Sequence, residues 1–150
     1  IGKGIGMRII ANDLVYDEVF MQTWNIEKHE RGHIARTSDF LTLHIPLLDN
    51  TRGLIDRETI MSMKPGSFLI NAARGEVLDE KAVLEALETG HLAGAAFDVF
   101  SSEPPFANET LARLLQHPNI IATPHVGAFT PEIRYKISKY LCDLLIPHAK

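Results

Sequence analysis

The feature that most constrains the fold is the stretch from Phe68 to Asp79, in which a short apolar run ends at an arginine–glycine pair. Pro65 and Gly66 precede the run, and its continuous apolar residues are typical of a strand covered on both faces. Asp79 is a favourable N-cap and opens a helical pattern. A strand, a cation, a glycine turn and a helix start together indicate the carboxyl edge of a parallel α/β sheet. Open α/β sheets bind their ligands at that edge.

Arg74 is the charged residue of this stretch, and it admits two interpretations. At a sheet edge its guanidinium can hold a carboxylate or a phosphate through two parallel hydrogen bonds. The same residue is also compatible with a surface ion pair at the end of a strand. The stretch alone therefore makes Arg74 a candidate for anion binding and leaves the choice open.

Composition limits the class of protein. A chain of 150 residues has the size of one domain, and its formal net charge of −4 argues against nucleic acid as a partner. The single cysteine, Cys142, excludes an internal disulfide, fits a reducing compartment and, in its apolar helical run, is predicted to be a packed core thiol. No stretch has the length of a membrane span or the pattern of a signal peptide, so we expect a soluble cytoplasmic protein.

The remaining chain alternates apolar runs of strand length with helical patterns and shows no internal repeat. This alternation predicts an α/β fold with a mostly parallel sheet. The expected strands are 7–13, 40–47, 68–73, 92–100 and 120–123, and the expected helices are 17–25, 57–63, 80–89, 110–116 and 130–145.

Two helices are expected to pack through apolar side chains. The first would bury Val19, Phe20 and Trp24. The last begins at Thr130-Pro131-Glu132, a well-formed helix start, and carries an apolar stripe at helical spacing. The stripe comprises Ile133, Ile137, Tyr140, Leu141, Leu144 and Leu145.

The strongly polar segment 27–36 is interpreted as a solvated connection. It contains His29 and His33 among alternating charges, and we expect no metal site there. The other histidines outside the sheet edge stand in polar or turn contexts and are predicted to be surface residues. They are His91, His117 and His148.

The chain opens with glycines at positions 2, 4 and 6, which form a G-x-G-x-G pattern. A dinucleotide fingerprint needs a preceding strand, the spacing G-x-G-x-x-G, a following helix and an acid roughly 20 residues further on. Only seven positions separate Gly6 from Asp13, so no helix fits between them. The glycines therefore predict an irregular loop. Asp13 itself ends a strand, where such an acid can accept hydrogen bonds from the adenosine ribose and disfavour a 2′-phosphate.

Three reactive side chains follow three of the expected strands: Arg74, Glu103 and His125. The carboxyl ends of parallel strands lie at one edge, so these residues can converge. Arginine can anchor a carboxylate, histidine can exchange a proton near neutral pH, and a carboxylate beside the histidine can orient its ring. This set suits the interconversion of a 2-hydroxy acid and a 2-keto acid, with hydride exchanged with a nicotinamide.

From Met7 to about Thr130 the chain resembles the nucleotide-binding domain of the D-specific 2-hydroxyacid dehydrogenases, most closely the phosphoglycerate dehydrogenase-like members. Three motifs in a specific order carry the resemblance. They are Ile70-Asn71-Ala72-Ala73-Arg74-Gly75-Glu76-Val77-Leu78-Asp79, Gly94-Ala95-Ala96-Phe97-Asp98-Val99-Phe100 through Glu103-Pro104, and Thr123-Pro124-His125-Val126-Gly127.

The resemblance implies a Rossmann-like, doubly wound parallel sheet, NAD as cofactor and a homodimer. It implies that Arg74 binds the substrate carboxylate, that His125 is the acid/base and that Glu103 supports His125. It also implies contacts to the cofactor. These lie at Asp13, Pro46, Ala72, Ala73, Asp98 and Gly127, with Asp13 on the adenosine ribose and Asp98 on the nicotinamide amide.

The chain also departs from the family pattern. The first nucleotide-binding strand and most of the glycine-rich helix are absent from the sequence, and so is the substrate domain. We therefore expect residues 1–150 to be a partial dinucleotide-binding domain. If these residues were the whole chain, we would expect poor solubility and at most millimolar affinity for NADH, or about 4 kcal/mol. Two alternatives to an enzyme remain open. One is a non-catalytic dinucleotide-binding or interaction protein of the same fold, and the other is an inactive fragment.

Overall fold

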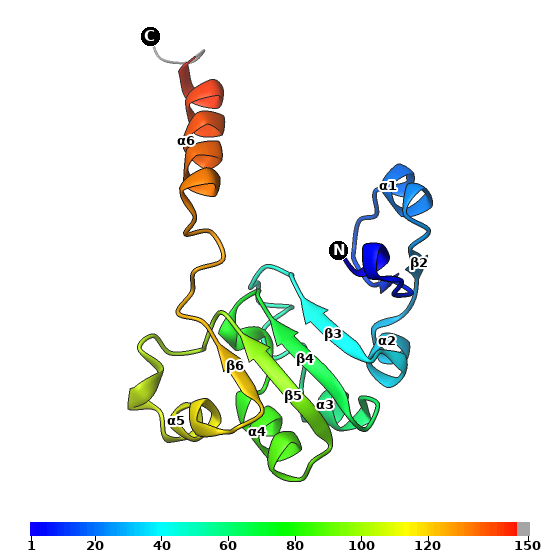
Figure 1. Cartoon of the computed structure of the whole chain (residues 1–150), viewed down its shortest axis with the longest axis vertical. Helices are drawn as coiled ribbons and strands as arrows, with labels where there is room; N and C mark the ends of the chain where they lie inside the picture. The colour runs from blue at the N-terminus through cyan, green and yellow to red at the C-terminus, as the bar shows by residue number, and fades with distance from the viewer. Residues whose placement is uncertain (147–150) are drawn as a thin grey trace.

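The computed structural model of the chain describes residues 1–146. Its centre is a parallel sheet of four strands, which lie side by side in chain order (Figure 1). The strands are β3 (Phe40–Leu43), β4 (Ser67–Asn71), β5 (Leu92–Phe97) and β6 (Ile120–Ala122). Because every pair is parallel, the four carboxyl ends lie at the same edge of the sheet. The predicted α/β class and its parallel sheet are confirmed.

A helix connects each strand of this sheet to the next, and an acid or amide side chain begins each helix. These helices are α3 (Arg57–Ser62), α4 (Glu80–Glu88) and α5 (Glu109–Gln116). Asp56, Asp79 and Asn108 each accept a hydrogen bond from the backbone N–H three residues further on. This satisfies a donor that the first turn of a helix leaves free. The predicted starts at Asp56 and Asp79 are confirmed.

The core lies between these helices and one face of the sheet. Leu41, Leu69 and Phe97 point from the strands toward apolar residues of α4 and α5, such as Val83 and Leu111, and all are buried. The opposite face is open within the described residues: Phe40 is 47% exposed and Phe68 38%. The expectation that the strand at Phe68 is covered on both faces is therefore wrong, because α3, α4 and α5 pack on one face.

The N-terminal segment forms a second, smaller sheet, in which β1 (Ile10–Ala11) pairs in parallel with β2 (Glu27–Lys28). Between them lies α1 (Glu18–Thr23), and α2 (Arg31–Thr37) leads on to β3. Over residues 1–146 no strand bonds to both sheets. The opening glycines form a short 3-10 helix, η1 (Gly2–Ile5). Within the described residues, no α-helix lies between η1 and β1.

Two predictions about this N-terminal segment are wrong. Val19, Phe20 and Trp24 do not pack, since each is at least half exposed, and Met21 is instead the buried residue of α1. The segment 27–36 is not a solvated connection, because it holds β2 and most of α2. In α2, Ile34 and Ala35 join the main core. The prediction failed because these two residues form a short apolar face within an otherwise polar sequence.

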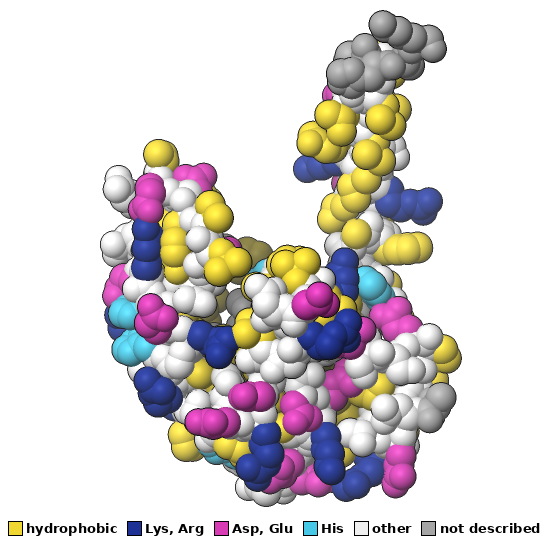
Figure 2. Space-filling model, turned by 180° about the vertical axis from the view of Figure 1, so that it is seen from behind, with side chains coloured by type: hydrophobic (Ala, Val, Ile, Leu, Met, Phe, Trp, Pro, Cys, Tyr) yellow, Lys and Arg dark blue, Asp and Glu magenta, His cyan; other side chains and the backbone are white. Residues whose placement is uncertain are grey.

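The last helix, α6 (Pro131–Leu145), extends away from the sheet at the end of an extended segment (Figure 1). Its N-cap Thr130 accepts a hydrogen bond from Ile133 N–H, as predicted. Its apolar stripe is not buried, and Cys142 is exposed rather than packed. Figure 2 shows hydrophobic side chains along this helix. Helical spacing predicted the stripe, but nothing within residues 1–146 covers it.

The strands of the structure are shorter than the apolar runs that predicted them. β1 has two residues, β3 ends at Leu43 rather than Leu47, and β5 ends at Phe97 rather than Phe100. The residues beyond each strand form the loops at the carboxyl edge. No helix within residues 1–146 is long and apolar enough to cross a membrane.

Candidate active site

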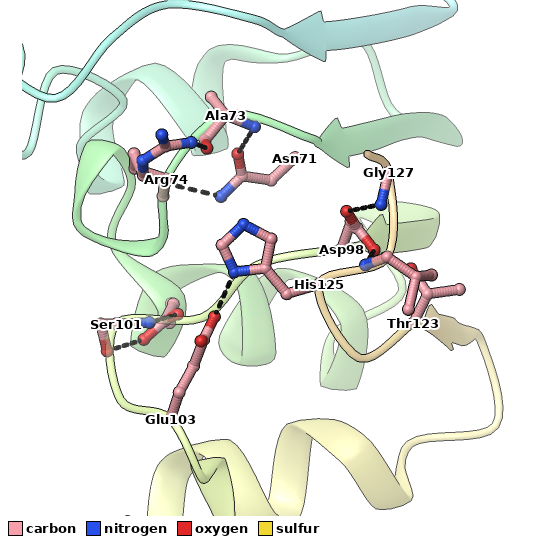
Figure 3. A network of polar contacts seen from close by, with 11 residues as sticks. Asn71, Ala73, Arg74, Asp98, Ser101, Glu103, Thr123, His125 and Gly127 are labelled. Carbon is pink, nitrogen blue, oxygen red and sulfur yellow. Dashed lines mark hydrogen bonds and ion pairs between the residues drawn. The ribbon is translucent and has the colours of Figure 1, made fainter. Parts of the chain in front are cut away.

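The turn after β4 presents Arg74 at the carboxyl edge of the sheet. Asn71, the last residue of β4, is fully buried and shapes this turn. Its side-chain oxygen accepts a hydrogen bond from Ala73 N–H at 3.0 Å, and its amide donates to the Arg74 carbonyl at 3.0 Å (Figure 3). Arg74 is exposed and donates one hydrogen bond to the Ala73 carbonyl at 2.6 Å. Among the described residues this is the one hydrogen bond found for its guanidinium, and the exposure of the side chain leaves it accessible to an anion.

Gly75 follows Arg74, and a side chain cannot replace its hydrogen. A Cβ at this position would lie 2.0 Å from both the Phe100 carbonyl carbon and the Ser101 nitrogen. The turn after β4 and the loop after β5 are therefore in direct backbone contact. This contact brings the segment of Arg74 against the segment that leads to Glu103.

The turn after β6 carries His125 and is held by a carboxylate at the end of β5. Asp98 accepts hydrogen bonds from the Thr123 hydroxyl and from the N–H groups of Val126, at 2.9 Å, and Gly127, at 2.9 Å. Burial acts to raise the pKa of Asp98, but these hydrogen bonds outweigh it and hold the pKa below its usual value. His125 has a φ of 54°, a left-handed conformation that few non-glycine residues adopt.

His125 and Glu103 form a pair across two loops. The Nδ1 atom of His125 lies 3.0 Å from Glu103 Oε1, and both side chains are half exposed. Figure 3 shows the imidazole between Glu103 and the segment that carries Asn71, Ala73 and Arg74. With Nδ1 bonded to a carboxylate, Nε2 is the ring nitrogen that remains to exchange a proton with a bound molecule.

An apolar pocket of about 380 Å³ lies beside this pair. Phe100, Phe106 and Leu115 contribute apolar walls, and His125 and Glu103 contribute its polar side. A histidine–carboxylate pair beside an apolar hollow is able to act on a small polar molecule that carries an apolar portion.

The structure places five of the six predicted cofactor residues at the same sheet edge. Pro46 follows β3, Ala72 and Ala73 follow β4, Asp98 follows β5, and Gly127 lies in the turn after β6. Ala72 and Gly127 are exposed, and their small size keeps the edge open for a flat ring. Asp98, in contrast, already accepts hydrogen bonds at both of its oxygens.

Asp13, the sixth of these residues, stands apart from the others. It is exposed, follows β1 in the small sheet, accepts a hydrogen bond from Leu14 N–H at 2.7 Å, and its own N–H donates to the Tyr16 hydroxyl at 3.0 Å. It lies after a strand of the two-stranded sheet, whereas the reactive residues lie at the edge of the four-stranded sheet.

Sequence reasoning identified Gly75 only as a turn, and it did not single out Asn71 or Thr123 as residues that shape the site. A buried polar residue at the end of an apolar strand is the signal that could have identified Asn71. The close backbone contact of Gly75 depends on residues 25 and 26 positions away, and a single sequence does not reveal it.

The other predicted surface histidines are more buried than expected. His29, His33, His91 and His117 are partly buried, and the rings of His29 and His33 stack at 4.3 Å. His148 lies outside the described residues. Within residues 1–146 no group of three or more His, Cys, Asp or Glu side chains could hold a metal ion.

Comparison with known proteins shows which proteins the chain is similar to. Residues 1–127 match the family model described as D-isomer specific 2-hydroxyacid dehydrogenase, NAD binding domain. The chain is 39% identical over 148 residues to the D-3-phosphoglycerate dehydrogenase of Bacillus subtilis, covering 99% of this chain and 27% of that protein. It is also 39% identical over 138 residues to the hydroxypyruvate reductase of Thermotoga maritima, covering 92% of this chain and 44% of that protein.

Solved structures agree with the sequence comparison. The NAD-complexed D-isomer specific 2-hydroxyacid dehydrogenase from Lactobacillus delbrueckii ssp. bulgaricus superposes with a TM-score of 0.85 at 29% identity, over 98% of this chain and 48% of that one. The D-lactate dehydrogenase from Aquifex aeolicus, complexed with NAD and lactic acid, gives a TM-score of 0.86 at 28% identity, over 96% of this chain and 46% of that one. The chain thus spans less than half the length of these relatives.

Proposed function

Because the chain belongs to the D-isomer specific 2-hydroxyacid dehydrogenases, in their NAD binding domain, we propose that its protein transfers a hydride between NAD(H) and a 2-hydroxy or 2-keto acid. The observation that carries this proposal is the convergence of Arg74 and the His125–Glu103 pair at one sheet edge. Residues 1–150 would be part of the dinucleotide-binding domain, and a substrate domain would lie outside this chain.

Each reactive residue has a distinct role in the proposal. Arg74 holds the substrate carboxylate with two parallel hydrogen bonds and so orients the neighbouring carbonyl. His125 donates a proton from Nε2 to the carbonyl oxygen during reduction, and takes it back during oxidation. Glu103 accepts a hydrogen bond from His125 Nδ1 and stabilises the charged ring. NAD(H), when bound, supplies or accepts the hydride.

The cofactor would lie along the carboxyl edge, over the small residues Ala72, Ala73 and Gly127 and beside Pro46. Asp98 would meet the nicotinamide amide through the oxygen lone pairs that its three hydrogen bonds leave free. Asp13 would bind the adenosine ribose and would repel a 2′-phosphate, so NADH should be preferred over NADPH.

An assay of NADH oxidation tests the proposal directly. The protein that carries this chain is mixed with NADH and each of several 2-keto acids. We expect turnover that His125→Ala abolishes while NADH binding persists. NADH binding without turnover for every acid would instead favour a non-catalytic dinucleotide-binding protein. Equal efficiency with NADPH would contradict the role of Asp13.

For the 150 residues alone we expect NADH binding no tighter than about millimolar, because the described residues contain no glycine-rich helix.

We also propose a cytoplasmic location and a homodimer without nucleic acid or membrane partners. The net charge of −4 and the single, unpaired Cys142 support the location and the lack of nucleic acid. The dimer rests on family membership, and sedimentation of the protein that carries this chain would test it.

A further inference from the structure

Glu80 is a buried carboxylate to which the proposed chemistry gives no role. It is the first residue of α4, a position where acids are usually solvated, yet it is only 8% exposed. One of its oxygens accepts a hydrogen bond from Ser101 N–H at 2.8 Å, and the other accepts one from the Ser101 hydroxyl. Burial raises the pKa of Glu80, and the Ser101 hydrogen bonds oppose this effect. Both oxygens of this buried carboxyl group thus accept hydrogen bonds from the same residue, Ser101.

Ser101 lies two residues before Glu103, in the loop that follows β5. The same piece of this loop touches Gly75, since the Phe100–Ser101 peptide fills the space that a Cβ would need there. The loop is therefore fastened at one point by two elements that follow β4: the turn at Arg74 and the start of α4. Glu103 extends from that fastened point toward His125 (Figure 3).

From this geometry we infer that Glu80 is a positioning residue for His125, acting through Ser101 and Glu103. By fixing Ser101, Glu80 holds the Glu103 carboxylate within 3.0 Å of His125 Nδ1. A carboxylate at Nδ1 accepts a hydrogen bond only from Nδ1–H, so it selects the neutral tautomer whose proton is on Nδ1. Nε2 is then left free to exchange the substrate proton. The inference rests on the proposed function for its purpose but not for its test.

The test determines the tautomer of His125 by NMR in the protein that carries this chain. Long-range ¹H–¹⁵N spectra distinguish Nδ1–H from Nε2–H imidazole, and a His125→Gln spectrum assigns the signal. In the unsubstituted chain at a pH where the ring is neutral, we expect mainly the Nδ1–H form. Glu80→Ala should change it to mainly the Nε2–H form, and Glu80→Gln, which keeps one acceptor for Ser101, should restore part of the Nδ1–H form.

Glu88→Ala is the matched control, because it removes an exposed carboxylate from the other end of the same helix. It should leave the tautomer unchanged. Ser101→Ala provides a second variant that keeps the buried acid and removes only the hydroxyl donor. It should shift the tautomer in the same direction even if Glu80→Ala fails to fold.

Two results would overturn the inference, and they have different meanings. If both variants fold and keep the Nδ1–H form, Glu80 only stabilises the loop, and the proposed function is untouched. If the unsubstituted chain already shows mainly Nε2–H at His125, the His125–Glu103 pair is not formed in solution. In that case the proposed function also loses the observation that supports it.

Discussion

Three hydrogen bonds to Asp98 hold His125 in a backbone conformation that the histidine would not adopt by itself. Left-handed conformations of non-glycine residues cost free energy and persist where surrounding contacts enforce them, often at functional sites. Here the Thr123 hydroxyl and the N–H groups of Val126 and Gly127 supply those contacts. The position of the proposed acid/base thus depends on a carboxylate from another strand.

Replacement of Asp98 by asparagine should therefore loosen the turn of His125. An asparagine has one oxygen to accept with, and its NH2 group would face an N–H that now has no acceptor. We expect a loss of about 2 kcal/mol in the free energy of unfolding, measured in urea. Asp39→Asn removes an exposed carboxylate that pairs with Lys64, and it should cost much less. Equal losses for both variants would contradict the role of Asp98.

Arg74→Lys tests whether the arginine binds substrate. Lysine keeps the charge but cannot form two parallel hydrogen bonds to a carboxylate. In the protein that carries this chain we expect kcat/KM for the keto acid to fall by about tenfold or more, or about 1.4 kcal/mol, with little change in NADH affinity. Arg52→Lys, at an exposed arginine, is the control. Unaltered keto-acid kinetics would mean that Arg74 is a structural residue.

The sequence predicted where capped helices begin and where buried strands lie. It did not predict which helices pack against the rest of the chain. Asp56 and Asp79 identified α3 and α4, because an N-cap is a local interaction between neighbours in sequence. The burial of α6 and α1 was predicted wrongly, since an apolar stripe says only that a partner is needed. The convergence of Arg74, Glu103 and His125 could be predicted, because the carboxyl ends of parallel strands share one edge. The hydrogen bond between Ser101 and Glu80 could not, because it joins residues that are 21 positions apart and a single sequence does not indicate it.

The pairing of β1 with β2 should depend on pH through Glu27. Hydrogen bonds from Arg8, and secondarily from His29, lower the pKa of Glu27 to about 2. The pKa of a glutamate in the unfolded chain is about 4.3, so between these two pKa values the unfolded state binds more protons than the folded state. The stabilising contribution of Glu27 is therefore present above pH of about 4.3 and is lost as the pH falls toward 2.

Amide hydrogen exchange can follow this transition. The N–H groups of Glu27 and His29 donate to the Ile9 and Ala11 carbonyls across the pair of strands. Relative to amides of β4, their protection should decrease between pH 4.3 and 2 once the intrinsic pH dependence is removed. Arg8→Gln should make the decrease much smaller. An unchanged decrease in that variant would assign the acid sensitivity to another group.

Residues 1–146 expose two apolar surfaces. One is the open face of the main sheet, where the rings of Phe40 and Phe68 stack at 5.0 Å and Ile121 is 70% exposed. The other is the stripe of α6, whose Leu145 is 61% exposed. Large exposed apolar patches are uncommon on monomeric soluble proteins and mark interaction sites or surfaces that are prone to aggregation.

We therefore expect the 150-residue chain to self-associate and to bind a hydrophobic dye. Sedimentation should show a mass that rises with concentration, because association removes apolar surface from water. Replacement of Phe40 and Phe68 together by threonine, which retains strand propensity, should reduce both the association and the dye binding. Lys64→Gln, at an exposed side chain, should change neither. A monodisperse monomer that binds no dye would show that these surfaces are covered within the chain.

The short pairing of β6 affects how long the site stays intact. β6 is one of the two edge strands of the main sheet, pairs with β5 through only three residues and leads directly to the turn of His125. Edge strands fray more readily than central ones, and short opening events of this kind need far less free energy than global unfolding. Detachment of β6 would withdraw the imidazole from Glu103 while Arg74, in the turn after the inner strand β4, stayed in place. On warming, the proposed proton exchange at His125 would then fail before the proposed anion binding at Arg74.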